Sequence, residues 1–190
     1  MPAPKVARTA TVALAILALS ACASSGSFRP VSDSPVRIGP TYTIRGNSYT
    51  PAADPTYDRL GHASWYGSES GNQTANGERF RPRWITAAHT TLPLPTYVEV
   101  TSLDTGRRII VRVNDHGPFA GGSRIIDLSR GAAERLGIRQ QGIAPVRVRA
   151  VEPPEKDRQR LREGKPARDL PPVPERTLQN LRAQMAAAGY

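Results

Sequence analysis

The sequence has one cysteine, three histidines and few aromatic residues, and its longest apolar run is short. Because Cys22 has no cysteine partner in the chain, an intramolecular disulfide is impossible and the fold depends on its core alone. The apolar run from Ala10 to Leu19 is shorter than the roughly 20 residues that a membrane-spanning helix needs. The sequence also lacks a serine-nucleophile motif, a phosphate-binding loop and a dinucleotide fingerprint. A disulfide-linked fold is therefore excluded, and nothing favours a nucleotide-dependent enzyme.

The N-terminus has the pattern of an export signal. Two basic residues precede the apolar run, and small residues follow it. The order Leu19-Ser20-Ala21-Cys22 resembles a bacterial lipobox, which implies a signal peptide over residues 1–21 and lipid attachment at Cys22. Ala23 stands where aspartate is associated with inner-membrane retention, so we expect an outer-membrane, periplasm-facing protein. The alternative is an ordinary signal peptide with a chance cysteine.

The chain is basic, with a net charge of +10, and the excess is concentrated in residues 59–151. Such a field favours acidic partners. Export argues against nucleic acid, and the acidic polymers of the cell envelope are peptidoglycan and anionic lipid. The alternative is that the arginines only solvate the surface.

The distribution of proline divides the chain into three parts after the signal peptide. Residues 22–58 are predicted to be a flexible linker, and residues 59–151 a globular domain. Residues 152–190 form a tail rich in proline and charge, in which we expect disorder. Residues 175–188 have a helical pattern of apolar residues, but a short isolated helix is only marginally stable.

The central part predicts short strands separated by turns. Apolar residues alternate in several segments, and Asp104-Thr105-Gly106 is typical of a hairpin turn. Ser129 and Gly137 are suitable caps for a short helix that ends at Leu136. The predicted strands are 63–67, 84–88, 97–103, 108–114, 125–128 and 145–151. This pattern predicts a mainly β fold, a small six-stranded barrel with one or two short helices and disordered extensions at both ends.

Three loops carry the residues that are candidates for catalysis or metal binding. Asp115 follows an apolar strand, where partial burial favours a general acid, although an Asx turn is an equal alternative. Glu78 lies in a turn and His89 follows a predicted strand. These residues and His116 have the chemistry of metal ligands, but their spacing matches no compact motif, and we predict neither a metal nor a cofactor.

Several segments of the central part stand out together by their order and spacing: Ala63–Gly67, Thr74–Glu78, Ala87–His89, Leu92-Pro93, Val111–Asp115, Gly117–Phe119 and Arg124–Ser129. In this order they resemble the rare lipoprotein A (RlpA) family of septal-ring lytic transglycosylases. The resemblance covers about residues 61–151 and implies a double-psi β-barrel. It also implies cleavage of MurNAc–GlcNAc linkages in glycan strands, particularly strands stripped of peptide.

The resemblance assigns roles to individual residues. It implies that Asp115 is the catalytic acid, and that Glu78 and His89 also take part in catalysis. The residues expected to bind substrate are Tyr66, Thr74, Asn76, His116 and Arg124. Arg124 has an alternative role, in which it fixes the barrel together with Asp127.

The sequence departs from the family in two places. His116 replaces the usual arginine after the catalytic aspartate, so an always-charged neighbour becomes one that titrates near neutrality. The tail after Val151 is short and rich in proline, so we do not expect the further glycan-binding domain of many members. The resemblance also suggests cell-division proteins as partners. Two other functions stay open: a noncatalytic peptidoglycan-binding lipoprotein, and an inverting hydrolase that uses Glu78 and Asp115.

Overall fold

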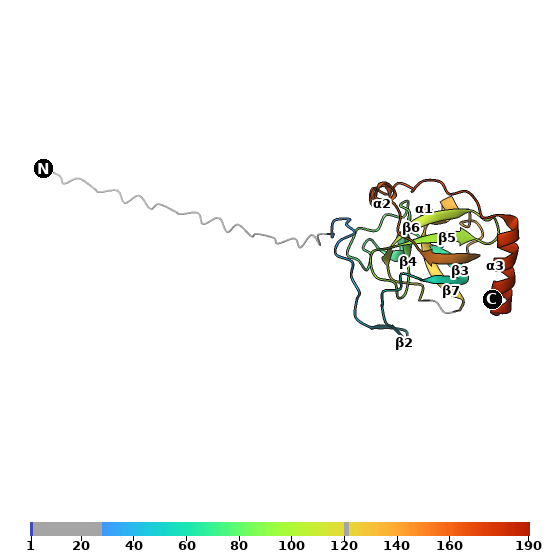
Figure 1. The fold of residues 1–190 in the computed structure, drawn as a ribbon. Coiled ribbons are helices and arrows are strands. Elements are labelled where there is room, and N and C mark those ends of the chain that lie inside the picture. The colour runs from blue at the N-terminus through green and yellow to red at the C-terminus, as the bar shows by residue number, and fades with distance from the viewer. Residues whose placement is uncertain (2–27, 120–121) are drawn as a thin grey trace.

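The computed structural model describes Met1 and residues 28–119 and 122–190; the predicted signal peptide and Cys22 lie outside these residues. Its main feature is a closed β-barrel, around which the other described segments are arranged (Figure 1). The barrel strands are β3 (Asp58–Tyr66), β4 (Thr86–Ala88), β5 (Thr96–Ser102), β6 (Arg108–Asp115), β7 (Arg124–Ser129) and β8 (Ala144–Ala150).

The strands close in the order β3-β7-β4-β6-β5-β8. The pairs β3–β7 and β4–β6 are parallel, whereas the other neighbouring pairs are antiparallel. Parallel neighbours cannot be joined by a tight turn, so the chain must cross over between them. Two such crossovers within six strands are the arrangement of a double-psi barrel, which confirms the predicted fold.

The hairpin of β5 and β6 shows how the sequence pattern builds the core. Val98 and Val100 on β5, and Val111 and Val113 on β6, are fully buried. Gly106 in the connecting turn has a φ of +72°, which glycine adopts without steric cost. Alternation therefore predicts correctly which side chains of these strands fill the barrel.

The helix predicted after Ser129 is also confirmed, as α1 (Arg130–Leu136). The Ser129 hydroxyl accepts a hydrogen bond from the N–H of Ala132 at 3.2 Å, which is a normal N-cap. Gly137 ends the helix with a φ of +91°. The two caps fix where the helix begins and ends, and the buried side chains of Ala132, Ala133 and Leu136 pack it against the barrel.

The C-terminal segment corrects the expectation of a disordered tail. It contains α2 (Glu155–Arg162) and α3 (Glu175–Ala187), in addition to α1 and the short 3-10 helix η1 (Ser68–Ser70). Leu161 of α2 is fully buried in the main core cluster. Leu178 of α3 packs in a second cluster with Leu103, which precedes the hairpin turn. These helices are stable because they pack on the barrel, which the sequence of the tail alone does not reveal.

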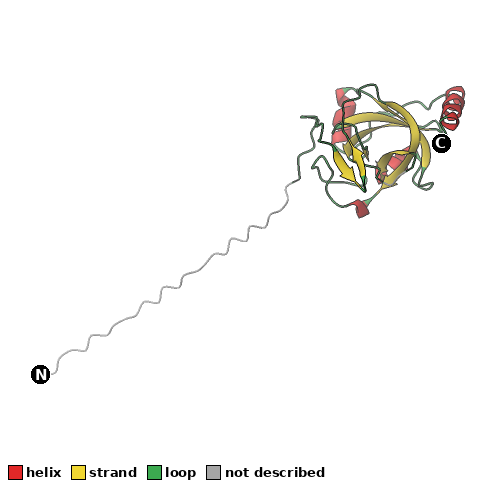
Figure 2. Cartoon of the chain, turned by 90° about the horizontal axis from the view of Figure 1, so that it is seen from below, coloured by secondary structure: helices red, strands yellow, loops and turns green. Residues whose placement is uncertain are grey.

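The segment before the barrel is likewise more ordered than the predicted flexible linker. From residue 28 onward it follows the barrel surface and forms a hairpin of β1 (Tyr42–Ile44) and β2 (Asn47–Tyr49). Two backbone hydrogen bonds, of 2.8 and 3.0 Å, join Arg37 to Leu94. The hairpin and α3 lie on opposite sides of the barrel (Figures 1 and 2). No helix in the described residues is long and apolar enough to cross a membrane.

Candidate active site

Asp115 is the last residue of β6, where the chain leaves the barrel. Its Oδ1 accepts hydrogen bonds from the N–H groups of Ala75 and His116, each at 2.8 Å. Both hydrogen bonds that the carboxyl makes within the described residues go to Oδ1, which leaves Oδ2 as the oxygen for a proton. Burial raises the pKa of Asp115, although the two amides and His116 oppose the rise. The carboxyl thus has both the turn contacts and the acid character that the sequence offered as alternatives.

Glu78 lies three residues after Ala75, and both oxygens of its carboxylate bind protein partners. Its side chain is 1% exposed and forms a two-point ion pair with Arg112, with N–O distances of 2.7 and 2.8 Å. The side-chain amides of Asn76 and Asn114 donate to its two oxygens at 3.1 and 3.0 Å. The carboxylate of Glu78 therefore has neither the exposure nor the spare oxygens to receive a substrate proton.

The loop that carries Glu78 is held in place by two of the residues predicted to bind substrate. The hydroxyl of Thr74 accepts from the Glu78 N–H at 3.2 Å and lies 3.3 Å from the Glu78 carbonyl oxygen. The backbone N–H of Asn76 donates to the Asn114 carbonyl at 3.2 Å. Because Ala75 lies between these two residues, the loop presents its N–H to Asp115.

His89 follows β4 and connects to Asp115 through the backbone, since its N–H donates to the Asp115 carbonyl at 3.0 Å. Its Nδ1 accepts from the N–H groups of Thr91 and Leu92, both at 3.1 Å. An accepting Nδ1 requires the neutral ring with its hydrogen on Nε2. Burial lowers the pKa of His89 to about 4, and the nearby His116 adds to this effect.

His116 connects the acid to the segment before the barrel. Its Nδ1 donates to the His89 carbonyl at 3.2 Å, and its ring stacks on that of Tyr42 at a centroid distance of 4.9 Å. Burial, with smaller contributions from Tyr49 and the charge of Asp115, raises the pKa of Tyr42 to about 12. Tyr42 is therefore a neighbour of the acid that the sequence did not identify.

A second carboxyl, Asp127 on β7, pairs with Ala88 of β4, which pairs with Asp115 on its other side. Its Oδ1 accepts from the Ser64 hydroxyl at 2.5 Å, and Arg124 approaches its Oδ2 at 3.7 Å. Burial raises the pKa of Tyr66 well above its usual value, and the charges of Asp115 and Asp127 both contribute. Tyr66 is thus electrostatically coupled to two carboxyls.

Four buried side-chain atoms in the described residues lack a hydrogen-bond partner: Tyr66 Oη, Thr86 Oγ1, Asn114 Oδ1 and Arg124 Nε. Two belong to residues predicted to bind substrate, and Asn114 directly precedes Asp115. Buried polar groups are normally paired with protein or water. The Thr86 hydroxyl is close enough to Tyr66 to lower the pKa of its phenol, so these two hydroxyls are near neighbours.

The structure therefore brings Asp115, Glu78, His89, Asn76, Thr74 and His116 together at one end of β4 and β6. Tyr66 and Arg124 lie toward β7, around Asp127. Sequence reasoning did not find Arg112 or Asp33, which accepts from Arg112 Nε at 3.1 Å. Arg112 lies in an alternating strand on the face opposite the core valines, and nothing in the sequence indicates that this face is covered.

A hollow of about 640 Å³ lies beside the two residues whose amides bind Asp115, although Asp115 itself does not line it. It is bordered on one side by Ala75, Asn76 and His116, and on the other by the segment from Val36 to Tyr42. No group of His, Cys, Asp and Glu in the described residues has the geometry of a metal site.

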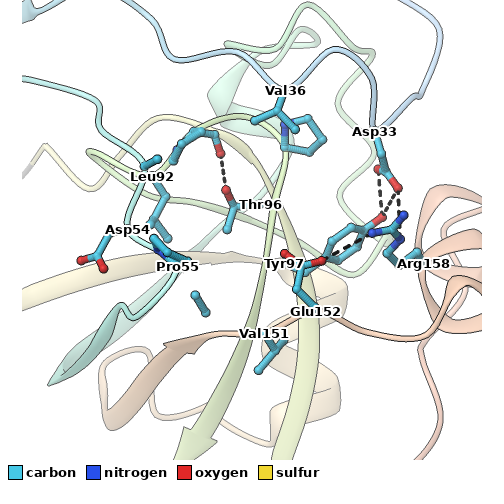
Figure 3. A pocket seen from close by; sticks show the side chains of 14 residues that line it. Asp33, Val36, Asp54, Pro55, Leu92, Thr96, Tyr97, Val151, Glu152 and Arg158 are labelled. Carbon is cyan, nitrogen blue, oxygen red and sulfur yellow. Dashed lines mark hydrogen bonds and ion pairs between the residues drawn. The ribbon is translucent and has the colours of Figure 1, made fainter.

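A second hollow, of about 420 Å³, lies between Asp33, Tyr97 and Val151, and none of the predicted site residues lines it. Figure 3 shows Asp33, Tyr97 and Arg158 gathered at one end of this pocket, and Leu92 and Pro55 at the other. Val36 borders both hollows.

Comparison with known proteins agrees with this geometry. Residues 59–148, which include nearly the whole barrel, match the family model described as "Lytic transglycolase". The endolytic peptidoglycan transglycosylase RlpA of Pseudomonas aeruginosa is 51% identical over 114 residues, 59% of this chain and 33% of the relative. That of Neisseria meningitidis is 46% identical over 115 residues, 60% of this chain and 48% of the relative. The part of the chain that is similar to these RlpA proteins is therefore the barrel.

The chain spans only about a third to a half of the length of these relatives. The RlpA of Rickettsia felis is 44% identical over 116 residues, 59% of this chain and 50% of the relative. Among solved structures, a Streptomyces papain inhibitor aligns with a TM-score of 0.42 at 23% identity, over 52% of this chain and 98% of the inhibitor. A Clavibacter michiganensis expansin aligns with a TM-score of 0.40 at 21% identity, over 52% of each chain.

Proposed function

We propose that this protein is an endolytic peptidoglycan lytic transglycosylase that cleaves MurNAc–GlcNAc linkages and leaves 1,6-anhydro-MurNAc ends. The observation that carries the proposal is the Asp115 carboxyl at the barrel mouth. Its Oδ1 is fixed by two amides, Oδ2 is left for a proton, and burial raises its pKa. The relationship to proteins named endolytic peptidoglycan transglycosylases supports the substrate class.

One proton carrier is sufficient for this reaction. Protonated Asp115 donates its proton to the glycosidic oxygen as the bond from MurNAc C1 to that oxygen breaks. The resulting carboxylate then takes the proton of the MurNAc C6 hydroxyl while O6 bonds to C1 and closes the anhydro ring. The carboxyl ends the cycle protonated, and no water is consumed.

In this scheme Glu78 and His89 do not transfer protons but hold Asp115 in position. The carboxylate of Glu78 fixes Asn76 and Asn114, and these residues hold the loop whose Ala75 N–H reaches Asp115. His89 fixes the other side, because its carbonyl accepts from the ring of His116, whose N–H also holds Asp115. We assign both residues to positioning the acid.

The burial of Glu78 argues against an inverting hydrolase. That reaction needs a second carboxylate, free to activate water on the other face of the sugar. Glu78 is 1% exposed and neutralised by Arg112, so it does not supply that base.

A noncatalytic peptidoglycan-binding lipoprotein is the second candidate. It is favoured by the two amide bonds to Asp115, which are also what a purely structural turn aspartate makes. The basic barrel would bind the acidic glycan in either case.

We further propose that lipid attachment at Cys22 holds the protein at the outer membrane, with the barrel facing the periplasm. The lipobox-like order Leu19-Ser20-Ala21-Cys22 supports this placement. Several buried acyl chains hold a protein firmly, at about 0.8 kcal/mol per methylene. Cell-division proteins are proposed partners on the family resemblance alone.

The function is tested by incubating the purified protein with peptide-stripped glycan strands. The proposal requires soluble fragments with anhydro-MurNAc ends. Reducing ends would select the hydrolase, and binding without any fragments would select the noncatalytic candidate.

A further inference from the structure

The segment before the barrel is fixed beside the acid at several points. Besides the paired bonds between Arg37 and Leu94, the Tyr42 hydroxyl donates to the Thr90 carbonyl at 2.6 Å. The Ala52 N–H donates to the Thr91 carbonyl at 3.0 Å. All of these bonds reach the loop that follows His89, so the segment has a defined position relative to the proposed active site.

An aromatic cluster marks where the segment meets the acid. Tyr42 stacks on His116, and on its other side it stacks on Tyr49 at 5.4 Å. Phe119 closes the cluster, with its ring 6.0 Å from that of Tyr42 and 5.6 Å from that of Tyr49. The hairpin is therefore packed on the residues that follow Asp115.

The hollow between this segment and the barrel has the properties of a ligand site. Its volume of about 640 Å³ is within the usual range of 300–1,000 Å³, and its lining is mostly apolar with a few polar groups. Val36 and Ile38 border it, and both are unusually exposed for large apolar residues, at 56% and 58%. Arg37 adds an exposed positive charge to the same rim.

We propose that the segment from Val36 to Tyr42 forms one wall of the glycan groove, and that this hollow binds a sugar unit adjoining the linkage that Asp115 cleaves. The proposal rests on the proposed function and extends it. The exposed apolar side chains of Val36 and Ile38 suit the C–H face of a pyranose, and Arg37 suits the lactyl or peptide carboxylate of a MurNAc unit. Asn76 and the backbone of Ala75 provide polar groups on the opposite wall.

The test uses binding, so that it does not depend on turnover. In the Asp115→Asn background, which is expected not to cleave, the affinity for peptide-stripped glycan strands is measured by calorimetry with and without Ile38→Asp. Ile143→Asp is the matched control, because Ile143 is 53% exposed and lies outside the hollow. We expect Ile38→Asp to weaken binding at least fivefold and Ile143→Asp to leave it unchanged.

Equal affinities for the two aspartate variants would overturn the subsite, as would a complete absence of glycan binding. Tyr42→Ala is a second test of the segment. Tighter binding or faster cleavage in this variant would show that the segment obstructs the groove, which would contradict the proposal. If the wild-type protein binds strands but releases no anhydro ends, the proposed activity fails while the subsite is still decided by the binding data.

Discussion

Arg112 and Glu78 form a two-point ion pair in which each side chain is 1% exposed, so neither charge has access to water. Arg112 also binds Asp33, whose carboxylate accepts from the hydroxyl of Tyr97 and pairs with Arg162 of α2. Through Arg112 and Asp33, the loop that carries Glu78 is thus linked to the segment before the barrel and to α2. The predicted linker and tail are structural parts of the site.

The first prediction concerns the ion pair. Glu78→Gln places an amide N–H₂ against the Arg112 guanidinium and leaves a buried charge short of a partner. We expect a loss of about 3 kcal/mol in the free energy of unfolding, measured by urea denaturation, together with reduced cleavage. The residual activity should keep the wild-type pH profile, because Glu78 does not transfer a proton in our scheme. Loss of one limb of that profile would show that Glu78 is a catalytic base.

The second prediction concerns the pH dependence of stability. The pKa of His89 is about 4 in the folded protein, against an ordinary value of 6.5. Between these values the unfolded chain binds a proton that the folded chain does not, so stability falls as the pH falls from 6.5 to 4. His89→Asn keeps an acceptor for the Thr91 and Leu92 amides and should reduce this fall by about 2–3 kcal/mol. An identical pH dependence in the variant would contradict the burial of a neutral imidazole.

The third prediction concerns Tyr66, whose hydroxyl has no hydrogen-bond partner in the described residues. Tyr66→Phe should leave the free energy of unfolding nearly unchanged but lower cleavage about tenfold, because the buried phenol is electrostatically coupled to Asp115. Tyr97→Phe is the control, because the Tyr97 hydroxyl is bonded to Asp33. The control should lose about 1 kcal/mol of stability. Full activity in Tyr66→Phe would remove Tyr66 from the site.

The fourth prediction tests the packing of the C-terminal segment. Leu178 of α3 is 3% exposed and packs on Leu103. Leu178→Ala should cost about 2–4 kcal/mol in the free energy of unfolding. Cleavage per folded molecule should not change, because α3 lies on the other side of the barrel from the hairpin beside the acid (Figure 2). An unchanged stability would mean that the tail is independent of the barrel.

Alternating apolar residues made most of the barrel predictable. The strands around Val98, Val111 and Val148 bury those residues as expected, because a half-buried strand shows its period in the sequence. Strand β3 begins at Asp58, earlier than the expected residue 63, because Arg59, Gly61 and His62 carry no apolar alternation. Backbone pairing with β8 and β7 fixes this strand, and such pairing leaves no local signal.

Motifs predicted that Asp115, Glu78 and His89 lie together, whereas they did not predict the residues that support them. Asp115, Glu78 and His89 were identified by resemblance, but the sequence offered no means to distinguish a proton carrier from a buried partner of Arg112. That distinction depends on Arg112 and Asp33, which are far apart in the sequence and meet only when the chain before the barrel folds onto β6.

The measurement that tests the account most directly is mass spectrometry of the fragments released from peptide-stripped glycan strands by the wild-type protein and by Asp115→Asn. We predict anhydro-MurNAc ends for the wild type and at least a 100-fold loss of product in the variant, which is the scale of general acid–base catalysis. The variant should be at least as stable as the wild type at neutral pH, because burial disfavours the carboxylate and an amide still accepts the two N–H bonds. Equal product from both proteins, or no anhydro product from a folded wild type, would contradict the central role of Asp115.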